Sequence, residues 1–429
     1  MRYCKRCMYP ENSKPTIIFD EEGICSGCRY NDSRLKVDWD QRERMFADLV
    51  DEAKKESIKR NNIYDCIVPV GGGKDSTFQV WLMKEKYGLN PLLVSYNHTF
   101  NTEAGLRNLE SLVINSGCNI VRYTINPKSA IKLARYMIKR IGDLTWHYHA
   151  GIMTLPIQVA VKYKIPFIFW GEEAYSELTG MFQLDDFVEF KKWTRKEHDM
   201  RGLEPEDLVN DPGSDIEWSD VSAFIYPTDE EIAELNLRGI YISNYFNWDA
   251  KKQTELVMRE YDFKGVTYKK GRSFVQYSKI DDHANDIHDY LKYLKFGYGR
   301  ATDEASYEIR HGRMTREEGA KIVEELDPFV PYALSEYLEL LGLTQEEFFD
   351  LVEDHRDLDI WEKVDGKWQI KDSIKNHVVE DGVEQARVNQ NEDRTFSKKN
   401  RNLYYNEDCL PELTGDSRLD VRKNNYKVL

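Results

Sequence analysis

The chain has 429 residues, with 60 lysines and arginines against 75 aspartates and glutamates, so its formal net charge is −15. This acidic balance disfavours a nucleic acid as the main partner, because phosphate binding requires a basic face. The first residues, MRYCKRCMYPENSK, lack the apolar core of a signal peptide, and no stretch approaches the roughly 20 apolar residues of a membrane span, so we expect a cytoplasmic protein without a membrane partner.

Four cysteines near the start have the spacing C-x2-C-x17-C-x2-C: Cys4, Cys7, Cys25 and Cys28. Two such pairs suit two turns that each present two thiolates to one tetrahedral zinc ion. Disulfides are disfavoured in a cytoplasmic chain, whereas an iron–sulfur cluster remains an alternative, because four cysteines are also its ligand set. Residues 1–35 are too few to build a core unaided, so we predict a structural zinc module with no open coordination position.

Residues 36–62 are charged and have a helical pattern, which predicts a helical linker. Beyond it, strands and helices alternate. Continuous apolar runs predict four strands: 63–70, 91–96, 119–125 and 166–172. The segments between these strands predict four helices: 75–87, 102–116, 129–141 and 149–164. This alternation is typical of a parallel sheet with helices on both faces, in which ligands bind at the carboxyl ends of the strands.

Beyond about residue 185 the alternation stops. The acidic stretch 200–225 contains glycine and proline and predicts a loop, and later segments begin with capping residues followed by acids, which indicates helices. We therefore predict an α/β domain over 63–225, a mainly helical substrate domain over 226–385 and a polar tail over 386–429.

The stretch VPVGGGKDST, residues 68–77, lies between the first predicted strand and helix. It is not a Walker A loop, G-x-x-x-x-G-K-[ST], because Val68 stands at the first glycine position and Asp75 follows Lys74. Glycines let backbone N–H groups approach an anion, and the N-terminus of the following helix points at it. The stretch therefore predicts a phosphate-binding loop, with a plain glycine turn as the alternative.

This stretch resembles the pyrophosphate loop, S-G-G-x-D-S, of the ATP pyrophosphatase (PP-loop) superfamily. The matching residues are Gly72, Gly73, Lys74, Asp75 and Ser76. Gly71 stands where the first serine is usual, which removes one hydroxyl donor. The resemblance implies an adenine nucleotide alpha hydrolase-like fold in which these residues, Gly71 included, bind ATP. It also implies catalytic roles for Lys74, Asp75 and Ser76, Mg²⁺ at Asp75, and adenylation with release of pyrophosphate.

A second stretch, GEEAYSE at residues 171–177, follows the fourth predicted strand. It resembles the G-T-x-N-x-S-E stretch of the NAD synthetase branch, which binds the nucleotide and places an acid on Mg²⁺. Gly171, Ser176 and Glu177 match, whereas the second and fourth positions do not. The resemblance implies nucleotide binding at Gly171 and a Mg²⁺ ligand at Glu177, with an acid on a solvated helix N-terminus as the alternative.

The order of cysteine module, loop and the stretch KFGYGRATDEASYEIRHGRMTREEG (295–319) resembles the N-acetyl sugar amidotransferases, which include enzymes of pseudaminic, legionaminic and acetamidino-uronic acid biosynthesis. The resemblance covers most of residues 1 to about 380. It implies conversion of a sugar acetamido group into an acetamidino group for lipopolysaccharide, O-antigen or flagellin glycans. The implied partners are an acidic N-acetylated sugar, free or nucleotide-linked, and a separate glutaminase that supplies ammonia.

Three arginines in or near this stretch, Arg300, Arg310 and Arg313, are candidates for binding the sugar carboxylate or its phosphates, with ion pairing on a helix surface as the alternative. His149 and His147 precede a predicted helix and can transfer protons during amination, but a structural role is at least as well supported.

Trp248, with Tyr241 and Tyr245, can stack on a sugar face, although core packing is the stronger interpretation. Two other functions stay open. A tRNA-thiolating enzyme also joins a PP-loop to cysteine modules, but the chain is acidic and Cys66 and Cys118 form no C-x-x-C pair. A non-catalytic nucleotide-binding protein would need no metal ligands at the phosphates, which the predicted acids argue against.

Overall fold

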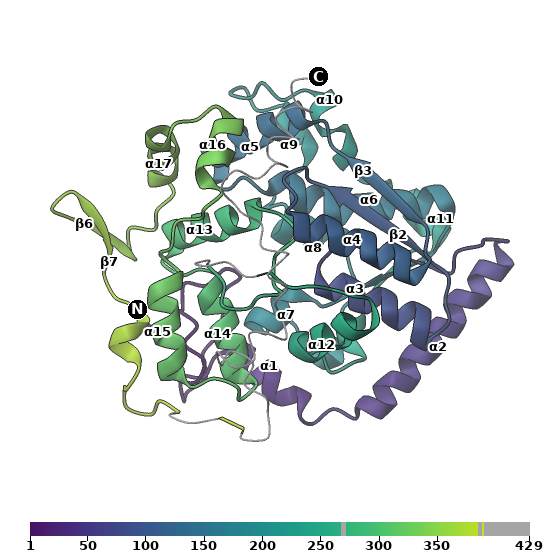
Figure 1. The fold of residues 1–429 in the computed structure, drawn as a ribbon, viewed down its shortest axis with the longest axis horizontal. Helices are drawn as coiled ribbons and strands as arrows, with labels where there is room; N and C mark the ends of the chain where they lie inside the picture. Colours follow the sequence, from purple (N-terminus) through teal and green to yellow (C-terminus); the bar gives the residue numbers. More distant parts are fainter. Residues whose placement is uncertain (267–271, 385–387, 390–429) are drawn as a thin grey trace.

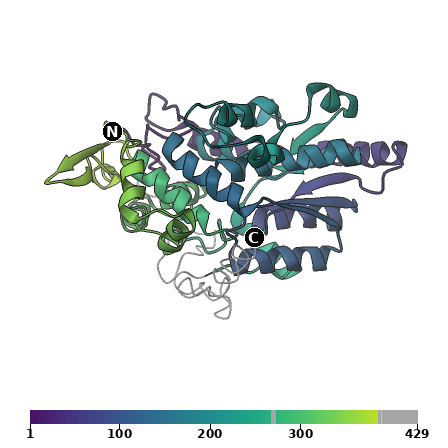
Figure 2. The ribbon, with the colours of Figure 1, turned by 90° about the horizontal axis from the view of Figure 1, so that it is seen from above.

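The computed structural model describes residues 1–266, 272–384 and 388–389, so the predicted tail over 386–429 lies almost wholly outside the described residues. Figures 1 and 2 show two halves. One half holds the sheet and its helices, and the other holds the N-terminal module packed with the C-terminal helices. No helix in the described ranges is long and apolar enough to cross a membrane.

A five-stranded parallel sheet, in the order β3-β2-β1-β4-β5, forms the first half. Its strands are β1 (Cys66–Pro69), β2 (Pro91–Asn97), β3 (Ile120–Thr124), β4 (Phe167–Trp170) and β5 (Arg238–Tyr241). Ile67 of β1 pairs with both Leu92 and Ile168. The central strands are buried on both faces, which explains their continuous apolar sequences. The strands β2 and β3 lie on one side of β1, whereas β4 and β5 lie on its other side, so the strand order switches between β1 and β4. In such sheets a ligand-binding crevice opens at this switch point.

The strand β5 extends the sheet beyond the predicted boundary at residue 225. It lies in the stretch 226–385 that the sequence predicted as mainly helical, so that boundary was wrong. Four residues are too few to show a period, and only pairing with β4 makes this segment a strand.

Helices lie on both faces of this sheet (Figure 2). The helices of this half are α2 (Trp39–Lys59), α3 (Lys74–Trp81), α4 (Glu103–Ser116), α5 (Pro127–Ile141), α6 (Trp146–Tyr163), α7 (Ala174–Thr179), α8 (Lys192–Thr194), α9 (Pro205–Val209), α10 (Trp218–Val221), α11 (Asp229–Leu235) and α12 (Ala250–Glu260). The linker 36–62 is helical as predicted. The helix predicted over 75–87 begins at Lys74 and finishes in a π-helical turn, Leu82–Lys86.

The second half is mainly helical, as predicted. It contains α13 (Ala284–Phe296), α14 (Arg300–Arg310), α15 (Arg316–Leu326), α16 (Leu334–Leu341), α17 (Gln345–Glu353) and a hairpin of β6 (Trp361–Val364) and β7 (Lys367–Ile370). Thr315 and Thr344 form capping boxes at the starts of α15 and α17.

The N-terminal module contains one helix, α1 (Ser26–Arg34). Its four cysteines share a buried core with Ala301, Ala305 and Ile309 of α14. The module is therefore not a separate body but packs on the C-terminal helices. A parallel α/β sheet, an N-terminal four-cysteine cluster and a helical C-terminal region together confirm the predicted fold class.

Candidate nucleotide and substrate site

The glycine loop lies where the crevice was expected, between the carboxyl end of β1 and the start of α3. Gly72 has a φ of 89°, and a side chain there would collide with the Gly105 carbonyl, so this position requires glycine. At Gly71 a Cβ would meet only the Asp281 carboxylate, at 3.5 Å, an ordinary contact. The Ser76 hydroxyl donates to the Gly73 carbonyl over 3.1 Å. The loop therefore lies at the N-terminus of α3 with a cavity above it, and backbone N–H groups in such a position suit an anion.

Two charged residues at the start of α3 form an ion pair, Lys74 with Asp75 Oδ2. Burial opposes the charge on Lys74, yet the carboxylates of Asp75 and Glu172 outweigh it and raise the pKa of Lys74. The other oxygen, Asp75 Oδ1, is buried and has no hydrogen-bond partner among the described residues. An unsatisfied carboxylate oxygen beside a phosphate loop fits a Mg²⁺ ligand.

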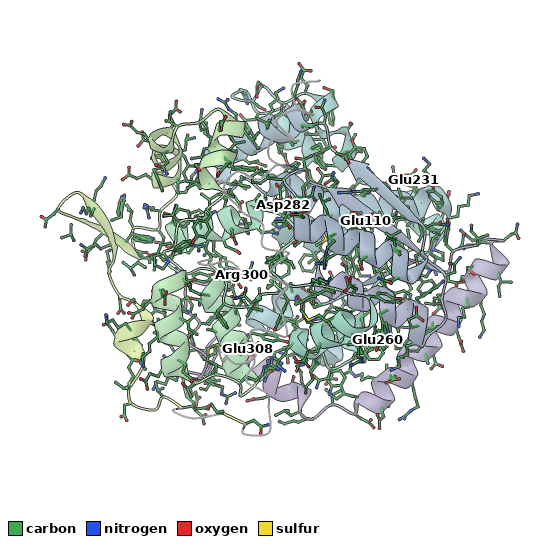
Figure 3. All side chains as sticks on the ribbon, in the orientation of Figure 1. Glu110, Glu231, Glu260, Asp282, Arg300 and Glu308 are labelled. Atoms are coloured by element: carbon green, nitrogen blue, oxygen red, sulfur yellow. The ribbon has the colours of Figure 1, made fainter. Side chains whose placement is uncertain are left out.

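Two adjoining cavities open from the loop. The first, of about 370 Å³, lies over Gly71–Ser76. The second, of about 320 Å³, lies between α7 and the helices α13 and α14. Their shared lining residues are Lys74, Glu172, Tyr277, Ser278, Lys279 and Arg300. Residues of the sheet half and of the C-terminal helices therefore form the wall that the two cavities share, and Arg300 lies between the two halves (Figure 3).

The two acids after β4 have different surroundings. Both carboxylate oxygens of Glu177 accept from Arg34 Nη1, at 3.1 and 2.8 Å, and Glu177 lines only the second cavity of the two. Glu172 lines both, and burial together with the charge of Asp75 raises its pKa to about 8. The sequence pattern missed Glu172, because it stands at a position that departs from the resemblance. Mg²⁺ at Glu177 stays a prediction and requires its ion pair with Arg34 to open.

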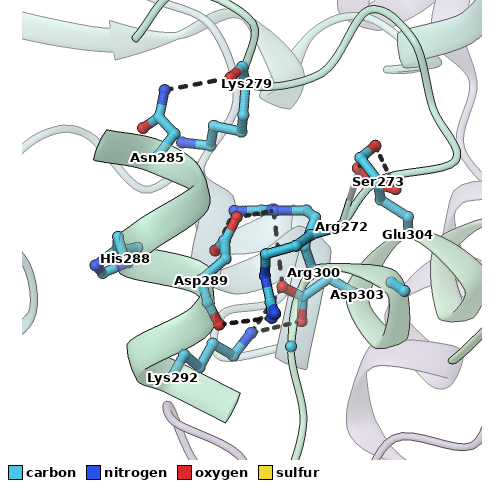
Figure 4. Close-up of polar contacts among 12 residues, drawn as sticks. Arg272, Ser273, Lys279, Asn285, His288, Asp289, Lys292, Arg300, Asp303 and Glu304 are labelled. Carbon is cyan, nitrogen blue, oxygen red and sulfur yellow. Dashed lines mark hydrogen bonds and ion pairs between the residues drawn. The ribbon is translucent and has the colours of Figure 1, made fainter. Parts of the chain in front are cut away.

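Only one of the three predicted arginines lines the two cavities. Arg300 does so, and its guanidinium donates to both oxygens of Asp289 at 2.8 and 2.9 Å (Figure 4). Arg310 instead lies within 3.7 Å of the sulfurs of two cysteines. Arg313 has no exposed side-chain surface and pairs with Glu308 and Asp249.

The second cavity carries charges of both signs on α13 and α14 (Figure 4). Lys292 contacts both oxygens of Asp303, at 2.8 and 2.7 Å. The carboxyl of Glu304 accepts from the Ser273 hydroxyl at 2.8 Å, and burial raises its pKa to about 8. A neutral Glu304 can donate a hydrogen bond, so this wall suits a polar ligand with both donors and acceptors.

Of the predicted residues Trp248, His147 and His149, one lines a cavity and the others are buried in the core. Trp248 is fully buried in the core and packs edge-on against Phe78, 5.7 Å between centroids, as the core-packing interpretation expected. His149 lies within α6 rather than before it, lines the second cavity and faces His288 at 5.7 Å. Burial and the neighbouring His288 lower the pKa of His149 to about 3, so it is neutral. His147 lies deeper, against the Tyr96 hydroxyl.

A further pair, which sequence reasoning missed, lies on the first cavity. His98 follows β2 and lines this cavity, and its Nδ1 lies 2.8 Å from Asp282 Oδ2. Asp282 also accepts from the Tyr148 hydroxyl and the Ala284 N–H. Burial opposes a charged imidazole, but Asp282 outweighs it and raises the pKa of His98. The partners are 184 residues apart, so no local pattern signals them.

The four cysteine side chains are fully buried, and their ligand atoms all lie within 4.8 Å of one another. This arrangement suits one tetrahedral ion held by four thiolates. Whether that ion is zinc stays a prediction.

We expect one zinc per chain in the purified protein, measured by elemental analysis. Serine at both Cys4 and Cys28 should remove it, whereas serine at Cys118, a buried cysteine outside the cluster, should not. An iron–sulfur absorption band, or folded protein without metal, would contradict the zinc assignment.

Residues 261–375 match a protein-family model described as LPS biosynthesis protein WbpG-like, C-terminal domain. A segment of 107 residues is 29% identical to the uncharacterized protein MJ1599 of Methanocaldococcus jannaschii. That match spans 24% of this chain and 36% of the relative, so the chain covers about a third of that protein.

Solved structures with weaker likeness include an NMN synthetase from Francisella tularensis, at 12% identity and a TM-score of 0.26, over 52% of this chain and 96% of that one. An NH3-dependent NAD synthetase from Campylobacter jejuni has 14% identity and a TM-score of 0.25, over 46% and 92%. The U34-tRNA thiolase NcsA from Methanococcus maripaludis has 12% identity and a TM-score of 0.22, over 61% of this chain and 83% of that one. Residues 261–375 are thus similar to the C-terminal domain of a WbpG-like protein of lipopolysaccharide biosynthesis, which agrees with the resemblance expected from the sequence of this part of the chain.

Proposed function

We propose that the protein is an ATP-dependent N-acetyl sugar amidotransferase of surface-glycan biosynthesis. The observation that carries this proposal is the shared wall of the two cavities. Lys74 and Glu172 come from the phosphate-loop half, whereas Tyr277, Lys279 and Arg300 come from the segment that matches the WbpG-like family. The predicted phosphate loop therefore adjoins a polar cavity that is lined in part by the segment similar to a lipopolysaccharide-biosynthesis domain.

The chemistry follows from this juxtaposition. An amide carbon is a poor electrophile and its oxygen a poor leaving group. In the proposed reaction the acetamide oxygen attacks the α-phosphorus of ATP, the bond to pyrophosphate breaks, and the loop with Lys74 stabilises the departing charge. Ammonia then adds to the activated carbon, loses a proton, and the C–O bond breaks to release AMP. Asp75 Oδ1, which is buried without a partner among the described residues, would be a ligand of Mg²⁺, and the bound ion would neutralise phosphate charge.

The acidic group of the sugar is assigned to the cationic residues of the second cavity, which lie among acids. Lys279, Lys292, Arg300 and Arg201 line it, together with Lys14 from the cysteine module. Ammonia is assigned to a partner glutaminase. The described cysteines outside the metal cluster, Cys66 and Cys118, are buried in the core rather than placed as nucleophiles.

We expect purified protein with ATP, Mg²⁺, an N-acetylated acidic sugar and ammonium salt to yield AMP, pyrophosphate and an acetamidino sugar. Raised pH should accelerate the reaction, because it increases free ammonia. Mass spectrometry should show a loss of about 1 Da from the sugar, since an oxygen is replaced by NH. Formation of ADP, or thiolation of RNA instead, would refute the proposal.

We also expect His98→Gln to weaken binding of Mg-ATP by roughly 10- to 100-fold, as for a lost hydrogen bond to a charged group. The proton on His98 is present below its raised pKa and lost as pH rises through it, so wild-type affinity should fall above the usual value of 6.5. The groups that set this pKa are Asp282, Asp281 and Arg122. Titration calorimetry over a pH series checks it: the same fall in the variant would show that His98 does not contact the phosphates.

A further inference from the structure

The cysteine module is in direct backbone contact with α7, the short helix that begins two residues after Glu172. A Cβ on Gly27 would lie 2.7 Å from the Leu178 carbonyl, and a Cβ on Gly180 would collide with the Ser26 carbonyl. The Ser26 hydroxyl also donates to the Thr179 carbonyl. The backbones of α1 and α7 are therefore in direct contact.

Arg34, the last residue of α1, ties the module to the cavity wall. Its side chain is 4% exposed, and it pairs with Glu177, which is 7% exposed and lines the second cavity. The same guanidinium donates to the Asn247 side chain at 3.2 Å and to the Trp248 carbonyl. Separating a charge pair that is buried to this degree is costly, because each charge would be left buried without its partner.

Arg310 links the metal cluster itself to α7. Its Nη2 lies 3.7 Å from the sulfurs of both Cys7 and Cys25, and its Nη1 donates to the Glu177 carbonyl at 2.9 Å. The position of this guanidinium thus depends on two thiolates that are gathered in one place. Four thiolates repel one another, so a cation is needed to keep them gathered.

The module also reaches the second cavity directly. Lys14, between the two cysteine pairs, lines it together with Tyr175, Glu177 and Leu178 of α7. One wall of the cavity is therefore built by the module and by the helix that the module holds.

From these contacts we infer that the four-cysteine centre positions the substrate cavity. The metal-loaded cluster fixes Arg310 and α1, and these two hold α7 in place, with Arg34 and Arg310 as positioning residues and Lys14 as a lining residue of the cavity. The inference concerns how the cavity is built and does not depend on the proposed reaction, so the two can fail separately.

Hydrogen exchange of the full chain, with and without a chelator that strips the cysteine centre, tests this coupling. We expect amide exchange in Ala174–Thr179 to rise at least tenfold together with that of α1, while β2 and α4 keep their protection. A rise confined to residues 1–35 would show an independent module and overturn the inference. An equal rise throughout the chain would show general support of the fold and would overturn it as well.

Variants that keep the metal sharpen the test. Gly180→Ala should raise exchange in α7 at least tenfold with one metal still bound per chain. Gly202→Ala is the matched control, because Gly202 also has a positive φ, 78°, but nothing lies within 4 Å of its Cβ position. Equal exchange in the two variants would contradict the coupling.

If Gly180→Ala does not fold, milder variants can test whether the module positions α7. Ser26→Ala removes only the hydroxyl bond to α7, and we expect a several-fold rise in α7 exchange. Arg34→Lys should retain most of the protection of α7 that Arg34→Gln loses, since lysine keeps the charge opposite Glu177. Equal loss in both Arg34 variants, or no change after Ser26→Ala, would count against a positioning role.

Discussion

Replacing Asp75 with alanine is expected to abolish pyrophosphate release while the protein stays folded. Loss of a preorganised electrostatic contact costs about 10²–10³ in rate, and loss of a metal ligand costs more. Asp75 would carry both roles in the proposed site, because Oδ2 holds Lys74 and Oδ1 is left without a partner among the described residues. Removing it therefore also releases the charge of Lys74 from its fixed place over the loop.

The assay measures pyrophosphate release with ATP and the sugar, and circular dichroism checks the fold. Glu110→Gln is a suitable control, since it also removes one carboxylate charge, from an exposed position on α4 away from the cavities (Figure 3). Near-normal turnover of Asp75→Ala would show that Gly71–Ser76 is a structural turn and not a phosphate loop.

Replacing Arg313 with methionine is expected to lower the free energy of unfolding by about 3–5 kcal/mol, the usual cost of breaking a buried charge pair by removing one partner. Arg313 pairs with Glu308 and with Asp249, whose side chain is 11% exposed. Both acids would remain buried without their guanidinium, and methionine fills a similar volume without replacing its hydrogen bonds.

Urea unfolding at neutral pH measures this effect. Arg259→Met is the control, because its ion pair with Glu260 is exposed to solvent and its loss should leave stability unchanged (Figure 3). If Arg313→Met instead keeps its stability and loses affinity for the sugar, the substrate-binding interpretation of Arg313 is right and the structural one is wrong.

Some features of this protein follow from local sequence. The strand–helix alternation, the glycine loop and the spacing of Cys4, Cys7, Cys25 and Cys28 each lie within a short stretch, and each was found in the fold where it was predicted. Local patterns suffice there because backbone hydrogen bonding, glycine φ angles and metal-ligand spacing are set by near neighbours in the chain. The short strand β5 lacks such a pattern and was missed.

Only the tertiary structure decided which charged side chains line the site. Arg300 and Arg310 lie on one helix and are chemically alike, yet one faces the cavities and the other the cysteine sulfurs. Glu172 and Glu177 are five residues apart, yet Arg34 engages only Glu177 of the two. A charged residue is assigned by the partner that offsets its desolvation. Arg300 finds that partner 11 residues away, in Asp289, whereas Glu177 pairs with Arg34, 143 residues away, and Arg310 contacts Cys7, 303 residues away.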